Sequence, residues 1–281
     1  GRIGALTIAT AEHMGEIFVT PVAAWAPRKF TDFSAQVKEW TLPVSEVISW
    51  KSRDGAVIEG VLTRPAGFDA AKKYPLLCVI HGGPTGIDMP SKVSGPRYYP
   101  TDIWAGRGAV ILRVNYRGSA GYGEKFRQLN VRNLGVGDAW DVESGVDSLI
   151  AKGFVDEKRV GVMGWSQGGY ISAFLTASST KFAAVSVGAG ISNWATYYYN
   201  TDITPFTRQY LGDDPAADPA IYQKTSPMTY TAGGRLKQRT GSRGITTSYS
   251  NNVAGEVLQV TYSDGSPGVT NTFDRLGRKS Q

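Results

Sequence analysis

The central part of the chain alternates between apolar runs and helically spaced segments. Four runs are almost continuously apolar, as expected of strands that are buried on both faces, and they cover residues 75–80, 109–114, 159–163 and 182–187. Residues 138–151 place apolar side chains at helical spacing, and residues 168–177 form the expected helix after the third run. This alternation predicts a mostly parallel, doubly wound sheet with helices on both faces.

A pair of strands precedes this sheet. Residues 45–51 and 57–63 flank Asp54-Gly55, a dipeptide that is typical of a hairpin turn. The central segment therefore extends from residue 44 to residue 230.

Both ends of the chain differ from this centre. Residues 1–43 contain one clear strand, at 16–20, and are too short to bury a core of their own. Residues 231–281 are rich in Gly, Thr, Ser and Arg and contain short alternating stretches such as 256–262, which predict hairpins. A weak repeat places glycine at the fifth position of three segments, 230–235, 251–256 and 273–278. We predict three units, with bounds 1–43, 44–230 and 231–281.

Composition supports a globular protein and limits its partners. Hydrophobic residues make up 41% of the 281 residues and charged residues 19%, which allows a sizeable core. Of the net charge of +6, the segment after Tyr230 carries seven basic against three acidic residues. The centre is thus near neutral, and the scattered basic residues of the tail indicate a solvated surface rather than a nucleic-acid site.

The sequence gives no support for a membrane protein, a secreted protein or a protein with a metal or cofactor. No run of about 18 apolar residues predicts a membrane span, and residues 1–10 lack the order of a signal peptide, so a cytoplasmic protein is favoured. The single cysteine, Cys78, is expected to be buried in a strand. No Cys/His cluster has metal-ligand spacing, and the glycines at 118–123 do not open a helix, so we expect no metal and no cofactor.

The strongest motif is Gly164-Trp-Ser166-Gln-Gly168, directly after a predicted strand and before a predicted helix. A sharp strand-to-helix turn presents a serine hydroxyl outside the backbone in a strained conformation, and the glycines let the strand and the helix approach closely. The bare pattern is weak, because a glycine-rich chain can match it by chance. Its position between strand and helix is what predicts Ser166 as a nucleophile.

A second motif, His81-Gly-Gly-Pro84, follows the strand at 75–80. Acyl transfer needs two N–H donors for the oxyanion, each worth roughly 3 kcal/mol. The N–H groups of Gly83 and Gln167 are the natural pair. Taken alone, the segment favours a plain Gly-Pro turn, and its pairing with the serine motif is what favours the oxyanion site.

With residues 115–127 and 135–142, these motifs resemble the prolyl oligopeptidase family, within it the acylaminoacyl and dipeptidyl peptidases. The resemblance runs from about residue 14 to residue 230. It implies an α/β-hydrolase fold, Ser166 as nucleophile and cleavage of short peptides or acylated amino acids. It also implies that residues 1–43 are the remnant of a β-propeller exit, and that Trp194, Tyr197 and Tyr198 line the substrate pocket. An aromatic run at that position is also typical of a core or a lid.

The resemblance ends where the family places its catalytic Asp and His. The chain turns at Tyr230 into the glycine-rich tail, which resembles YD repeats of the Rhs type. The expected fold therefore lacks the last strands of the family, and we expect the tail hairpins to cover the open sheet edge. Of the two histidines, His13 is expected to be incidental and His81 structural, and no Asp is assigned, although Asp264 and Asp274 lie in the tail.

Two functions remain open from the sequence. The first is a serine peptidase or esterase that acts through an acyl-enzyme on short peptides, acylated amino acids or esters. The second is a catalytically impaired hydrolase-fold fusion that binds a ligand or has no function. A third interpretation, a fragment of a repeat-type adhesion or toxin-shell protein, has only the tail as its evidence. The sequence leaves the oligomeric state open, and a homo-oligomer is one of the possibilities.

Overall fold

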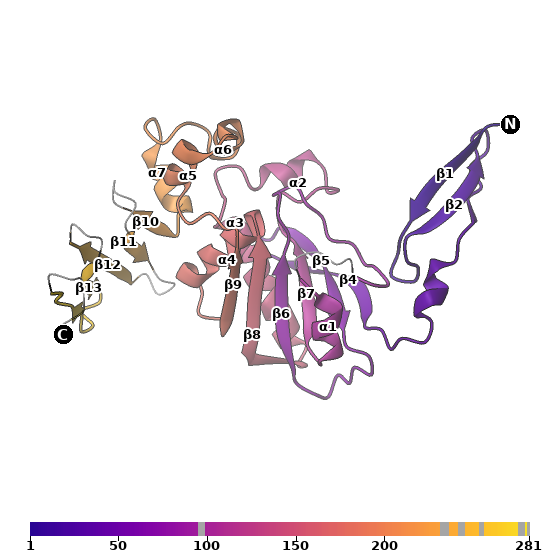
Figure 1. Cartoon of the computed structure of the whole chain (residues 1–281), viewed down its shortest axis with the longest axis horizontal. Coiled ribbons are helices and arrows are strands. Elements are labelled where there is room, and N and C mark those ends of the chain that lie inside the picture. The colour runs from indigo at the N-terminus through magenta and orange to yellow at the C-terminus, as the bar shows by residue number, and fades with distance from the viewer. Residues whose placement is uncertain (95–98, 231–235, 241–244, 253–255, 275–278, 280–281) are drawn as a thin grey trace.

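The computed structural model describes residues 1–94, 99–230, 236–240, 245–252, 256–274 and 279. Within these residues the chain forms three separate β-sheets, and the third begins with β10 (Met228–Tyr230) inside the predicted central unit. The largest sheet lies in the middle, with the N-terminal sheet on one side and the tail sheet on the other (Figure 1).

The central sheet has six strands in the order β4-β5-β7-β6-β8-β9. They are β4 (Val44–Lys51), β5 (Val57–Arg64), β6 (Tyr74–Ile80), β7 (Val110–Asn115), β8 (Val155–Trp165) and β9 (Ala184–Gly188). Strands β7, β6, β8 and β9 pair in parallel, while β4 and β5 form the antiparallel hairpin that leads into the sheet. The six predicted strands and the mostly parallel sheet are confirmed.

Helices cover the two faces of this sheet unequally. Helices α3 (Gly137–Ala151) and α4 (Gln167–Ser178) pack on one face, where Cys78, Leu112 and Val162 belong to the main core. The short helix α1 (Thr101–Gly106) packs on the other face over a smaller cluster with Val79 and Ile111. Helix α1 was not predicted, nor were four further described helices: α2 (Glu124–Gln128), α5 (Trp194–Asn200), α6 (Thr204–Leu211) and α7 (Pro219–Thr225).

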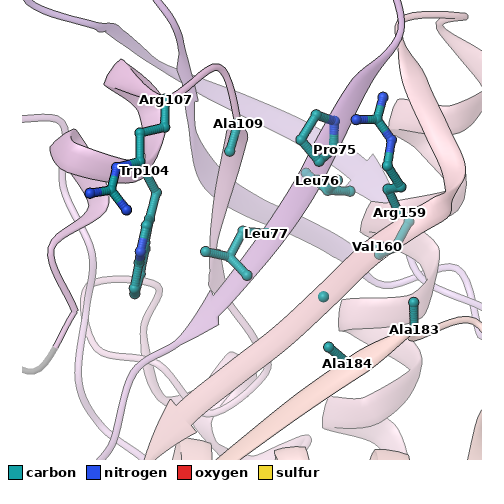
Figure 2. Close-up of a pocket in the computed structure, with 11 residues that line it drawn as sticks. Pro75, Leu76, Leu77, Trp104, Arg107, Ala109, Arg159, Val160, Ala183 and Ala184 are labelled. Atoms are coloured by element: carbon teal, nitrogen blue, oxygen red, sulfur yellow. The ribbon is translucent and has the colours of Figure 1, made fainter.

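The face that carries α1 is open beyond that helix. A slot of about 310 Å³ lies there, lined mainly by apolar side chains that include Leu77 and Trp104 (Figure 2). On β9, at the edge of the sheet, Ala184 and Ser186 are exposed on this face. The sheet is therefore covered more completely on the α3–α4 face.

The N-terminal sheet consists of β1 (Ile3–Ile8), β2 (Glu16–Pro21) and β3 (Arg28–Lys29), followed by the 3₁₀ helix η1 (Phe33–Val37). Strand β1 was not predicted. The fully buried Glu16 joins the sheet to η1, because its carboxylate accepts hydrogen bonds from Thr31, Phe33 and Ser34. Burial acts to raise the pKa of Glu16, but these hydrogen bonds outweigh it and lower the pKa to about 2.

The tail forms antiparallel hairpins, as predicted. Its strands are β10 (Met228–Tyr230), β11 (Leu236–Thr240), β12 (Thr246–Asn251), β13 (Val257–Tyr262) and β14 (Val269–Thr270). Among the described strands, these pair only with one another, in chain order. None of the described tail strands pairs with β9, the edge strand of the central sheet, whose one described partner is β8. The expectation that the hairpins cover the edge of the central sheet is therefore wrong. The three glycine repeats lie largely outside the described residues.

Candidate active site

Ser166 occupies the turn between β8 and α4. Its φ of 58° and ψ of −118° lie in a region that residues with a Cβ atom rarely adopt. The turn is fixed on both sides, since the Ser166 N–H donates to Gly188 O at 2.9 Å and its carbonyl accepts from the Tyr170 N–H at 2.9 Å. The side chain is exposed. The hydroxyl is therefore presented outward by a strained backbone, as the sequence predicts.

The two glycines of the motif are needed because the backbones touch. A Cβ atom on Gly164 would lie 2.3 Å from the carbonyl of Gly168, and one on Gly168 would lie 2.0 Å from Ile80 O. Any side chain at either position would force β8, α4 and β6 apart. The predicted reason for both glycines, close approach of strand and helix, is confirmed.

The two predicted oxyanion donors flank this turn. Gln167 is the first residue of α4, and Gly83 has a φ of 134° and precedes Pro84 through a cis peptide bond. In the described part of the chain, neither N–H donates a hydrogen bond. Gly82 lies directly against Ser166, because a Cβ atom there would be 3.2 Å from Ser166 Cβ. The assignment of the two N–H groups to an oxyanion stays a prediction.

A cavity of about 600 Å³ opens beside Ser166 at the carboxyl ends of the parallel strands. It is lined by Ser166, by the neighbouring Trp165 and by residues of β6, β7, α1 and the loop after β6. Ligands of open α/β sheets bind at this end of the strands. The cavity is therefore the candidate substrate site.

His81 lines the cavity, but both of its ring nitrogens are engaged by other groups. Nδ1 lies 2.8 Å from Gly82 O, Nε2 lies 2.9 Å from Ser119 Oγ, and the ring stacks on Tyr116. Burial lowers the pKa of His81, although the Gly82 carbonyl and the charge of Asp88 oppose this. The structure thus places His81 in a packing role.

No base for Ser166 is found elsewhere in the described residues. The Ser166 hydroxyl makes no hydrogen bond there, and His13, Asp264 and Asp274 are not among the residues that line its cavity. Within the described residues, no group of three or more His, Cys, Asp or Glu could hold a metal ion. None of the described helices is both long enough and apolar enough to cross a membrane.

The predicted pocket aromatics lie on α5. Trp194 is fully buried and packs against Tyr170, Tyr197 and Phe206, so it belongs to the core. Tyr197 and Tyr198 are half-buried. None of the three lines the Ser166 cavity, and a role of the tyrosines in substrate binding stays a prediction.

Sequence reasoning missed a buried ionic network behind the site. Arg117 is 1% exposed and binds Asp141 of α3 through Nε and Nη2, at 3.0 and 2.8 Å. Its Nη1 and Nη2 also reach Asp54 in the β4–β5 turn, at 2.8 and 3.0 Å. The network ties the hairpin, the end of β7 and α3 together. Its signal in the sequence was an arginine and an aspartate inside the motif segments 115–127 and 135–142.

The fold defines the class of protein, an α/β-hydrolase, and the strained turn at Ser166 has the form of the nucleophile elbow of this class. The family model that describes the prolyl oligopeptidase family matches residues 98–240, just over half of the chain. The chain belongs to the prolyl oligopeptidase family, and this membership supports a serine hydrolase.

Individual relatives agree with this family. The chain is 33% identical over 199 residues to the uncharacterized peptidase YuxL of Bacillus subtilis (strain 168), a match that covers 70% of this chain and 29% of the relative. It is 31% identical over 183 residues to dipeptidyl peptidase 8 of Homo sapiens, covering 64% and 20%. The structure of Pyrococcus horikoshii acylaminoacyl peptidase is similar with a TM-score of 0.67 at 28% identity, covering 78% of this chain and 35% of that chain. The chain thus spans less than a third of the length of these curated relatives.

Proposed function

We propose that the chain is a serine peptidase or esterase that forms an acyl-enzyme on Ser166. The observation that carries the proposal is the strained, outward-facing Ser166 with two N–H groups beside it that have no partner among the described residues. A carbonyl attacked by Ser166 would place its developing oxyanion near the N–H groups of Gly83 and Gln167. The similarity to acylaminoacyl and dipeptidyl peptidases favours short peptides, acylated amino acids and esters as substrates.

The expected rate is low unless a base is supplied. Loss of the base of a serine triad lowers turnover by about 10⁶-fold. The oxyanion donors and substrate binding alone leave roughly 10³–10⁴ over the reaction in water. We therefore expect activity on activated esters such as p-nitrophenyl acetate and none on peptide amides.

Labelling by a fluorophosphonate probe tests the proposal, with the modified peptide located by mass spectrometry. Labelling confined to Ser166, absent in Ser166→Ala, is the expected result. Added imidazole should accelerate it, because the cavity of about 600 Å³ beside Ser166 has room for an exogenous base.

The engaged nitrogens of His81 favour a second candidate, a hydrolase-fold protein that binds ligands without turning them over. Equal, trace hydrolysis by the wild type and Ser166→Ala, with no labelling in the presence of imidazole, would support this candidate and refute the first. We also keep the YD-repeat interpretation of the tail as a proposal, supported by its antiparallel hairpins.

A further inference from the structure

The cavity beside Ser166 contains one cation and one anion among its described lining residues. These are Arg113 on β7 and Asp88 in the loop after β6, while most of the remaining lining is apolar, aromatic or hydroxyl-bearing. In small-molecule pockets, a few precisely placed polar groups fix the orientation of the ligand. The hydrogen bonds that Arg113 and Asp88 already make therefore indicate which charged group of a ligand could bind there.

Arg113 uses few of its donors. Its side chain is 11% exposed, and its Nε–H is buried without a hydrogen-bond partner among the described residues. Nη1 lies 3.4 Å from Asp88 Oδ1, and Nη2 lies 3.2 Å from Met89 O. Hydrogen bonds between charged groups are normally about 2.7–2.9 Å long. The contact with Asp88 is therefore long, and the remaining donors of the five in a guanidinium have no partner among the described residues.

Arg117, four residues further along the chain, is a buried arginine whose side-chain nitrogens are all close to acceptors, and it serves as a comparison for Arg113. It makes five side-chain hydrogen bonds of 2.8–3.2 Å to two carboxylates and the Ser52 hydroxyl. A buried cation that lacks such partners carries an uncompensated desolvation cost. A ligand carboxylate that took the free donors of Arg113 would remove part of this cost.

The strand register gives the distance between Arg113 and the nucleophile. Arg113 pairs with Val79 on β6, Val79 pairs with Met163 on β8, and Ser166 follows Met163 by three residues. Two strand spacings and a rise of three residues place the two Cα atoms about 14 Å apart. The arginine side chain spans part of this distance, so that the remainder fits a ligand of amino-acid size.

We propose that this cavity binds a substrate whose acyl group carries a carboxylate, with the carboxylate on Arg113 and the reacting carbonyl at Ser166. The reaction of the substrate carbonyl at Ser166 rests on the proposed function. Binding of the carboxylate to Arg113 does not depend on it. A carboxylate is favoured over an amine because the Arg113 Nε–H is buried without a partner among the described residues, whereas Asp88 Oδ1 already contacts Arg113. Asp88 acts as an internal competitor for the same guanidinium.

Binding to the full-length Ser166→Ala protein tests the proposal without turnover. Monomethyl glutarate should raise its melting temperature, and dimethyl glutarate at the same concentration should not. Arg113→Gln, in the same background, should weaken binding of monomethyl glutarate at least about tenfold, since hydrogen bonds to a charged group are lost. Asp88→Asn should strengthen it, because the competing carboxylate is gone.

Several outcomes would overturn the proposal. Equal binding of the two esters, binding of neither, or an unchanged affinity in Arg113→Gln would each do so. Preferential binding of methyl 5-aminopentanoate would also overturn it and would assign the site to an amine on Asp88. Melting of each variant without ligand checks that it is folded. Failure of fluorophosphonate labelling together with a retained carboxylate preference would refute the proposed reaction while supporting this site.

Discussion

Replacing Ser166 with glycine should stabilise the protein while it removes the nucleophile. A residue with a Cβ atom held at φ 58° and ψ −118° costs about 1–3 kcal/mol, and glycine avoids most of this cost. Glycine also makes the unfolded chain more flexible, which removes about 0.4–1 kcal/mol. The side chain is exposed, so little packing is lost. The free energy of unfolding should rise by about 0.5–2 kcal/mol.

Urea unfolding measures this difference. Ser166→Ala keeps the Cβ atom, and with it the strain, so its midpoint should stay close to that of the wild type. Ser186→Gly, at an exposed position of β9, should lower stability by about 0.5–1 kcal/mol and serves as the control for the flexibility of glycine. The reasoning is refuted if Ser166→Gly is no more stable than Ser166→Ala.

Three further predictions concern buried charges. The pKa of Glu16 falls from 4.5 to about 2 on folding, so its stabilisation is full above pH 4.5 and is lost as the pH falls towards 2. Acid titration by circular dichroism should show this loss in the wild type and not in Glu16→Gln. Burial raises the pKa of Asp138 to about 7, so its contribution is full below pH 3.8 and is lost as the pH rises through 7. In thermal melts, the melting temperature of Asp138→Asn minus that of the wild type should be larger at pH 8 than at pH 4. The same difference at the two pH values would contradict this. Arg117→Met leaves Asp141 buried without its partner and should cost about 3–5 kcal/mol in urea unfolding. Arg53→Met, at an ion pair whose arginine is 60% exposed, should cost about 1 kcal/mol or less.

The central sheet and the strained turn at Ser166 could be predicted because their signals are local. Buried parallel strands produce continuous apolar runs, and the elbow requires Gly164, Ser166 and Gly168 at fixed spacing. Helix α7 was missed although its signals are present. Asp218 accepts from the Ile221 N–H as an N-cap, and Pro219 occupies the first turn.

The rest of the site depends on contacts between residues that are distant in sequence. Nothing local shows that Arg113 has unused donors, because these depend on Asp88 and Met89 in another loop. A lone arginine inside the apolar run 109–114 was the only signal. Trp194 looked like a pocket residue because aromatic side chains serve both pockets and cores, and only packing distinguishes the two.

The strand β9 has a consequence for how the protein behaves in solution. Its outer edge leaves backbone N–H and C=O groups unpaired along Ala184–Gly188 in the described structure. This segment carries no charge and no proline, which are features that natural proteins use to protect such edges. Two copies that paired along β9 would form one sheet running through both molecules. Pairing of this kind would make the observed state depend on protein concentration.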